Sequence, residues 1–170
     1  MFSVNLINHA GFSNGQEQKL ISALKKFETV MNSDLLKQRI LNFSSTLGNR
    51  FEDNLGLSNE QVFEKLYAGA EEYSPLADYE ADLYLFLVKK RRPLLSRHPA
   101  IGYGIPGQKE IYTYTWWFNS AVDYDYAGHI AHEWSHKVGF DHAFNPTSTR
   151  NFSVPYAFGN IIEELSKQII

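Results

Sequence analysis

Three histidines and one glutamate occur close together in residues 132–142, which read His-Glu-Trp-Ser-His-Lys-Val-Gly-Phe-Asp-His. The pattern is His-Glu-x-x-His-x-x-Gly-x-x-His, where x is any residue. Imidazole nitrogens are common zinc ligands, and a carboxylate beside them can act as a base toward a metal-bound water. In a chain of this composition, the full pattern arises by chance in roughly a few of a hundred thousand sequences. The segment therefore predicts a zinc site.

The first part of the pattern fits one face of an α-helix. Residues four apart lie on the same face about one turn from each other, so His132 and His136 can bind the same cation. Glu133 lies roughly 100° around the helix from His132, where its carboxylate can reach a water on the metal without being a ligand. We expect Glu133 to act as general base in the hydrolysis of a peptide or amide bond.

The third ligand requires a turn. Gly139 is placed to end the helix, because only glycine adopts the left-handed conformation without steric cost. The chain can then bring back His142, and three neutral imidazoles leave a fourth coordination position open, as in catalytic zinc sites. His129 shares the helix face, but about 10.5 Å of helix rise separates it from His136, too far for both to bind one ion with His132. We expect His129 to be a surface residue or to lie behind the ligands.

Residues 132–142 resemble the extended zinc-binding signature of the metzincin metallopeptidases. The resemblance implies a zinc-dependent endopeptidase with one catalytic zinc ion, bound by His132, His136 and His142, and a peptide or protein substrate. It implies that Glu133 is the base and later donates a proton to the leaving amine. It also implies a zincin-like α/β (α+β) fold, a single domain with a twisted mixed sheet, packing helices and an active-site helix that carries the His-Glu-x-x-His pattern.

One element of the family pattern is missing. Metzincins carry a methionine-containing turn after the third histidine, whereas the only methionines here are Met1 and Met31. Residues 153–156, Ser-Val-Pro-Tyr, are similar to that turn in having a serine before and a tyrosine after the central position. One hypothesis is that Pro155 replaces the methionine and that the Tyr156 hydroxyl points toward the oxyanion of the reaction. The alternative is that this pair only opens the last helix, since proline favours the first helical turn.

Two other interpretations stay open. In a gluzincin-type peptidase the third ligand comes from a later helix, and Glu163 or Glu164 could supply it. The apolar stripe of the last predicted helix leaves both glutamates at least about 120° away, where solvated charges usually lie, so we favour His142. The second interpretation is a non-catalytic, zinc-stabilised binding module. Glu133 argues against it, because a structural zinc site needs no carboxylate beside its ligands.

Strands and helices are expected to alternate around the motif. Apolar density and alternation predict strands at 2–7, 79–89 and 111–118, and segment 98–107, rich in glycine and proline, is not expected to stay regular for long. Capping serines predict helices that start near 13, 33 and 58, before the motif helix and a last helix through 169. By resemblance, strand 111–118 or segment 101–105 borders the cleft, where an extended substrate can pair with it.

The bulk properties limit the classes of function. The chain of 170 residues fits one domain, 1–170, and its 44% hydrophobic and 21% charged residues are ordinary for a soluble globular protein. The net charge of −3 predicts no nucleic-acid surface, and the basic run 89–92 is expected to be a solvated turn. The longest apolar run, 83–88, is too short to span a membrane. The chain has no cysteine and no visible signal peptide, so it stays inside or a leader was removed. Compartment, oligomeric state and substrate preference stay open.

Overall fold

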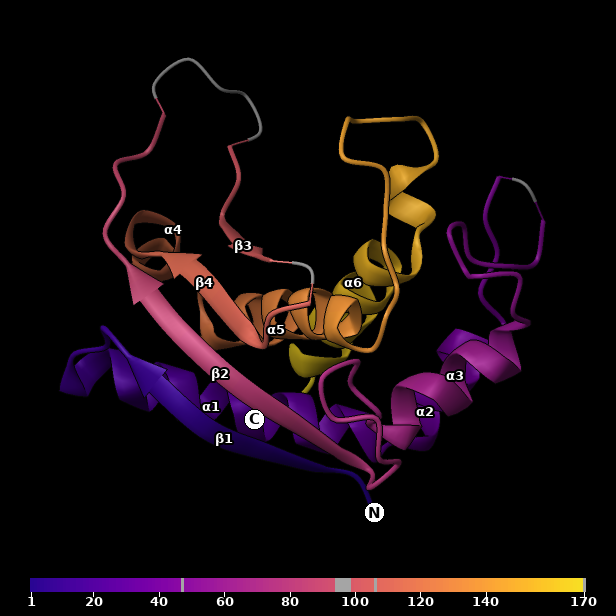
Figure 1. Cartoon of the computed structure of the whole chain (residues 1–170), viewed down its shortest axis with the longest axis horizontal. Coiled ribbons are helices and arrows are strands. Elements are labelled where there is room, and N and C mark those ends of the chain that lie inside the picture. The colour runs from indigo at the N-terminus through magenta and orange to yellow at the C-terminus, as the bar shows by residue number, and fades with distance from the viewer. Residues whose placement is uncertain (47, 94–98, 106, 170) are drawn as a thin grey trace.

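The computed structural model describes residues 1–46, 48–93, 99–105 and 107–169. Within these residues the chain forms six α-helices and one open mixed sheet of four strands (Figure 1). The strands, in chain order, are β1 (Ser3–Ala10), β2 (Glu80–Val88), β3 (Gly102–Gly104) and β4 (Glu110–Tyr114). The helices are α1 (Asn14–Met31), α2 (Asp34–Leu41), α3 (Asn59–Ala68), α4 (Thr115–Ser120), α5 (Asp123–Lys137) and α6 (Val154–Ser166), with a 3-10 turn, η1, at Arg150–Phe152.

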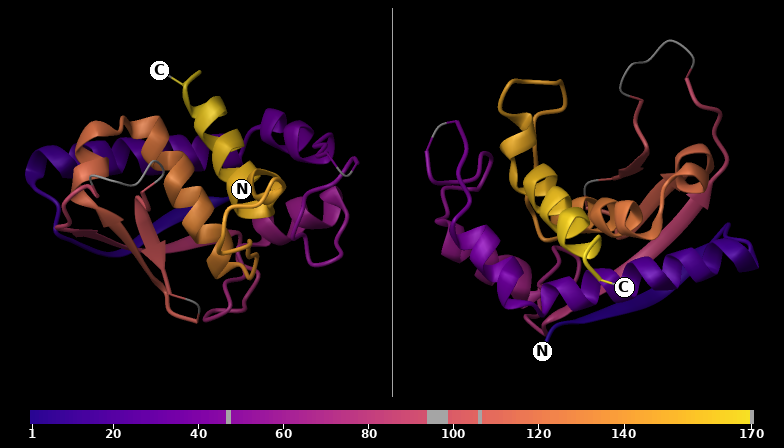
Figure 2. Two further views of the ribbon diagram at one scale, coloured as in Figure 1. Left: turned by 90° about the horizontal axis from the view of Figure 1, so that it is seen from above. Right: turned by 180° about the vertical axis from the view of Figure 1, so that it is seen from behind.

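The sheet has the order β1-β2-β4-β3. β1 and β4 each pair with β2 in parallel, and the short β3 pairs with β4 antiparallel at one edge. Along β2, buried residues alternate with half-buried ones, as expected for a strand whose two faces differ in burial. Seen from above, the helices lie on one side of the sheet (Figure 2). This side carries the core and the residues of the motif helix.

The predicted helix starts are confirmed. The Gln16 side chain accepts a hydrogen bond from the Ser13 N–H (2.9 Å), and the Gln61 side chain does the same for Ser58 (2.9 Å). The Ser33 hydroxyl accepts from the N–H of Leu36 (3.1 Å). These contacts satisfy backbone groups that the first helical turn leaves without a partner. None of the helices in the described ranges is both long and apolar enough to cross a bilayer.

Helix α5 is held in place by Trp134, whose side chain is fully buried. The indole ring packs against Phe2, Phe27 and Phe158, with ring centroids 5.6, 5.8 and 6.4 Å away. Its N–H donates a hydrogen bond to the carboxylate of Glu71 (2.8 Å). Removing such a side chain typically costs about 3–5 kcal/mol of stability. The core therefore fixes the helix that carries the histidines against Phe2, α1 and α6.

The predicted strand at 111–118 is wrong in its second half. The strand ends at Tyr114, and α4 follows from Thr115. The helical turn brings Phe118 into the core, where its ring lies 4.7 Å from that of Tyr126 and 5.4 Å from that of Phe12. Aromatic residues at successive positions fit a strand or a short buried helix equally well, so the sequence alone did not separate the two.

Candidate metal centre

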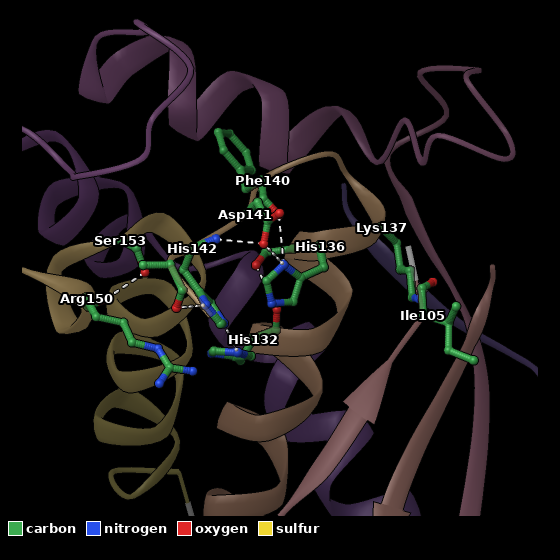
Figure 3. A network of polar contacts seen from close by, with 11 residues as sticks. Ile105, His132, His136, Lys137, Phe140, Asp141, His142, Arg150 and Ser153 are labelled. Carbon is green, nitrogen blue, oxygen red and sulfur yellow. Dashed lines mark hydrogen bonds and ion pairs between the residues drawn. The ribbon is translucent and has the colours of Figure 1, made fainter. Parts of the chain in front are cut away.

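The three histidines of the motif come together at the C-terminal end of α5 (Figure 3). His132 and His136 project from α5, and His142 comes from the loop that follows. The Nε2 atoms of His132 and His142 are 3.3 Å apart, and one ring nitrogen of each histidine lies within 4.8 Å of the others. Two nitrogens that bind one tetrahedral zinc ion are roughly 3.4 Å apart. The three imidazoles could therefore hold a single ion of this kind.

Gly139 makes the turn that returns His142, as predicted. Its φ is +92°, in the region that L side chains rarely adopt, and its N–H donates to the carbonyl of His136 (3.1 Å). A Cβ at this position would also lie 3.0 Å from a carboxylate oxygen of Glu72. Glycine at this position thus allows the helix to end directly after His136 and Lys137.

Backbone carbonyls orient two of the imidazoles. Nδ1 of His136 lies 2.8 Å from the carbonyl oxygen of Phe140, and Nδ1 of His142 lies 3.1 Å from that of Ala143. Because a carbonyl only accepts, Nδ1 carries the proton in each ring and Nε2 keeps its lone pair for a metal. Burial lowers the pKa of His136 to about 4 and the pKa of His132 well below its ordinary value. The His132 and His136 rings are therefore neutral near pH 7, as metal ligands must be.

Glu133 lies next to the ligands and is 8% exposed. Burial raises the pKa of its carboxyl group to about 7, although nearby Lys137 and a hydrogen bond from the Gly104 N–H both act to lower it. A general base works best when its pKa is near the working pH. The Glu133 carboxyl group is therefore suited to take up and release a proton at neutral pH.

Two glycines of β3 let this edge strand approach α5 closely. A Cβ on Gly104 would lie 3.0 Å from the Lys137 ammonium and 3.3 Å from a Glu133 oxygen. A Cβ on Gly102 would lie 2.9 Å from the His129 ring and only 2.4 Å from the carbonyl oxygen of Tyr112. Sequence reasoning did not single out these glycines. The alternating Gly-x-Gly within segment 98–107 was the available signal, since it leaves one face of a strand bare.

Lys137 ties the end of α5 to the turn that follows β3. Its ammonium is buried and donates to the carbonyls of Gln108 (2.6 Å) and Ile105 (3.3 Å). Figure 3 shows the side chain extending toward Ile105, away from the histidine rings. Lys137 therefore joins the motif helix to the opposite wall of the site, which the sequence did not reveal.

His129 is not a surface residue, contrary to one of our two expectations. It is 6% exposed, and its Nε2 lies 3.1 Å from the hydroxyl of Thr113. The Trp117 ring covers it at a centroid distance of 5.0 Å. Its Nδ1 is 3.9 Å from Glu133, so it lies behind the carboxylate and outside the group of three histidines. The covering elements, β4 and α4, come from earlier in the chain, and helix periodicity could not predict them.

Tyr156 lies against the histidines, while Pro155 stands in the first turn of α6. The Tyr156 ring centroid is 4.5 Å from that of His132 and 4.8 Å from that of His142. Burial raises the pKa of its hydroxyl. The proline thus does open the last helix, and the tyrosine is nevertheless part of the site.

A close crossing of α5 and α6 sets the position of that first turn. A Cβ on Gly159 would lie 2.8 Å from the carbonyl oxygen of Gly128 and 3.0 Å from the His132 Cβ. At the start of α6, the Glu52 carbonyl accepts from the Val154 N–H (3.2 Å). Neither contact has a separate signal in the sequence, because each depends on how distant segments pack.

The glutamates of the alternative ligand set are engaged elsewhere. Glu163 accepts from the Lys167 ammonium (2.6 Å), and Glu164 pairs with Arg39 (2.5 Å). The group of possible metal ligands found among the described residues consists of His132, His136 and His142 and includes neither glutamate. The geometry therefore favours the histidine set.

The chain was compared with protein-family models, curated proteins and solved structures. No protein-family model, no curated protein and no solved structure matched the chain. The function is therefore inferred from the site itself. Three imidazoles that can share one ion, with a carboxylate of raised pKa beside them, can bind a metal and move a proton.

Proposed function

We propose that the chain is a zinc-dependent endopeptidase of the metzincin type, with a zincin-like fold and a peptide or protein substrate. The observation that carries the proposal is the approach of three histidine nitrogens to within 4.8 Å of one another beside the buried Glu133. The motif requires such an arrangement, and it leaves room for a fourth, non-protein ligand. A purely structural zinc site does not require the Glu133 carboxylate beside its ligands.

In this proposal His132, His136 and His142 hold the metal through their Nε2 atoms. Zinc held by these residues would supply a coordinated water with a pKa of about 7 and a positive charge for the substrate carbonyl. Glu133 takes the proton from the attacking water and passes it to the departing amine. Lys137 and the Gly104 N–H hold β3 and the Glu133 side chain in their relative positions.

The edge strand β3 is the expected place for the substrate backbone. In the described part of the chain it pairs with β4 along one side and stands last in the sheet, and on its other side the Gly104 N–H donates to Glu133. An extended peptide can add to such an edge as a further strand. Tyr103, 40% exposed on β3, stacks on Tyr112 with ring centroids 4.8 Å apart and would lie beside that peptide.

Tyr156 is placed to donate a hydrogen bond to the oxyanion that forms during hydrolysis. Its ring is fixed by His132 and His142, and its raised pKa keeps the hydroxyl protonated. We expect Tyr156→Phe to lower kcat about 10²-fold, as is typical for the loss of one oxyanion donor. The measurement is steady-state cleavage of a fluorogenic peptide. Unchanged turnover would remove Tyr156 from the mechanism.

The main test compares wild-type protein with Glu133→Gln. Both should bind about one zinc ion per chain, measured by elemental analysis after dialysis, because the substitution leaves the ligands intact. Cleavage of a peptide library, read by mass spectrometry, should fall about 10³-fold in the variant, because the base is lost. Equal cleavage by both proteins would contradict the proposed role of Glu133. Absence of zinc from the wild-type protein would contradict the metal site itself.

A further inference from the structure

Arg150, in η1, reaches the metal centre from the side of α6. Its guanidinium lies over the Tyr156 ring, 4.8 Å from the centroid, and close enough to His132 to lower the pKa of that imidazole. Figure 3 shows the guanidinium on the same side of the loop as the His132 and His142 rings. The side chain therefore adds a fixed positive charge to the border of the candidate site.

The charged head of this arginine has no anionic partner among the described residues. Its Nε is buried and without a hydrogen-bond partner, and none of the ion pairs in that part of the chain includes it. A guanidinium is always charged and presents its donors in a planar fork that matches a carboxylate. Stacking on a tyrosine ring occupies one face of the plane and does not itself use the N–H groups at its edge.

The acidic groups near the centre are already engaged. Asp141 accepts from the His142 N–H (2.7 Å) and faces His136, with Oδ1 3.7 Å from Nδ1. Glu133 faces Lys137 and Gly104. When a dication is bound, Arg150 and the metal together would add positive charge to this border of the site. An anion supplied by the substrate would be attracted to it.

We propose that Arg150 determines specificity by binding a carboxylate of the substrate close to the scissile bond. The carboxylate is the side chain of an acidic residue or the free C-terminus of a peptide. The inference rests on the proposed peptidase function, because it places the substrate at the same centre. It adds the class of substrate, a peptide with a negative charge near the cleaved bond.

The first arm of the test measures binding without turnover, on zinc-loaded Glu133→Gln protein. The probes are acetyl-Ala-Ala-Glu-amide with its Gln counterpart, and acetyl-Ala-Ala-Ala with its amide. The nitrogen-15 NMR signal of the Arg150 Nε–H, assigned by its loss in Arg150→Lys, should shift with a carboxylate peptide and not with its neutral partner. A shift with acetyl-Ala-Ala-Glu-amide indicates that Arg150 binds an acidic side chain. A shift with acetyl-Ala-Ala-Ala indicates that it binds a free C-terminus. No shift with either acidic peptide would overturn the proposal.

The second arm measures cleavage of longer peptides matched in the same way. The wild-type protein should favour the carboxylate peptide at least about 10-fold in kcat/KM, and the ratio should fall to about one in Arg150→Gln. Arg150→Lys, which keeps the charge, should retain part of this preference for the carboxylate peptide.

The melting temperatures of Arg150→Gln and Arg150→Lys show whether each variant folds. An unchanged ratio in folded Arg150→Gln would overturn the proposal. If the Arg150 NMR signal shifts with a carboxylate peptide but the wild-type protein cleaves no peptide, the peptidase function is contradicted. The carboxylate site at Arg150 is then still supported.

Discussion

The two walls of the candidate site are built in different ways. One wall consists of the end of α5 and the loop to His142, and all three histidines lie within residues 132–142. The other wall is β3, which belongs to the sheet and approaches α5 through Gly102 and Gly104. Helix geometry and one glycine turn are enough to predict the first wall. The second depends on strand register and on contacts between distant segments, which spacing does not encode.

Lys137 connects the two walls. It lies inside the motif, at a position that the pattern leaves free, yet its ammonium contacts carbonyls beyond β3 and not the histidines. Helix positions 129, 133 and 137 follow each other at one-turn intervals and together face β3 and β4, whereas His132 and His136 face the loop and α6. One face of α5 thus carries two metal ligands, and the neighbouring face positions the proposed base, Glu133.

The largest effect is expected on the first wall. His142→Ala should reduce bound zinc from about one ion per chain to almost none, because two imidazoles alone form a weak and incomplete site. The double variant Glu163→Gln, Glu164→Gln should keep its zinc, since neither glutamate lies in the histidine group. Elemental analysis after dialysis against low metal gives both values. The opposite result would support the ligand set in which a glutamate replaces His142.

The buried carboxyl group between the walls predicts a dependence of stability on pH. The pKa of Glu133 is about 7 in the folded chain and 4.5 ordinarily, so the folded chain keeps a proton that the unfolded chain loses in this window. Stability due to this group is therefore greatest below pH 4.5 and falls as the pH rises toward 7. Glu133→Gln cannot lose that proton, and we expect it to exceed the wild type by about 3 kcal/mol at pH 8 and hardly at all near pH 4.

Urea unfolding of both proteins with EDTA present measures this difference. The titration of the histidines occurs in both proteins and cancels in the comparison. A difference in unfolding free energy that does not change with pH would show that Glu133 titrates normally and is not held in an apolar environment.

Smaller effects are expected from adding a methyl group to the second wall. Gly102→Ala should lower stability by roughly 2 kcal/mol, because its Cβ would meet the Tyr112 backbone at 2.4 Å, and backbone cannot easily move. Gly104→Ala should cost less than about 1 kcal/mol, because the nearest atom is the flexible end of Lys137 at 3.0 Å. Both variants should keep their zinc.

Gly15→Ala is the matched control, since nothing lies within 4 Å of a Cβ at that position in α1. It should raise the melting temperature slightly, by the difference in helix propensity. Equal stability of the three variants would mean that β3 does not press against α5, and the two walls would then be independent.

Much of the site could be predicted from the sequence, because its parts are local. His132, His136 and Gly139 occupy their expected places on a helix and its terminal turn, and the capping serines mark the starts of earlier helices. The strand predicted at 111–118 was too long, because Thr115–Ser120 form α4, and the sequence left open whether His129 lies at the surface or behind the ligands. Trp117 and Thr113 decide this by covering His129. Burial by a distant element leaves no periodic trace in the segment that it covers.

The sequence by itself determined which side chains can act on a metal and that they share one helix and one turn, since covalent spacing and helix pitch decide this. Only the tertiary structure decided what surrounds them. The packing of Gly159 on Gly128 and the pairing of β3 with β4 place the walls. Among the described residues Arg150 has no anionic partner, although the chain has 19 acidic residues. Whether a charge is paired depends on which segments meet in space, and that is settled only when the whole core packs.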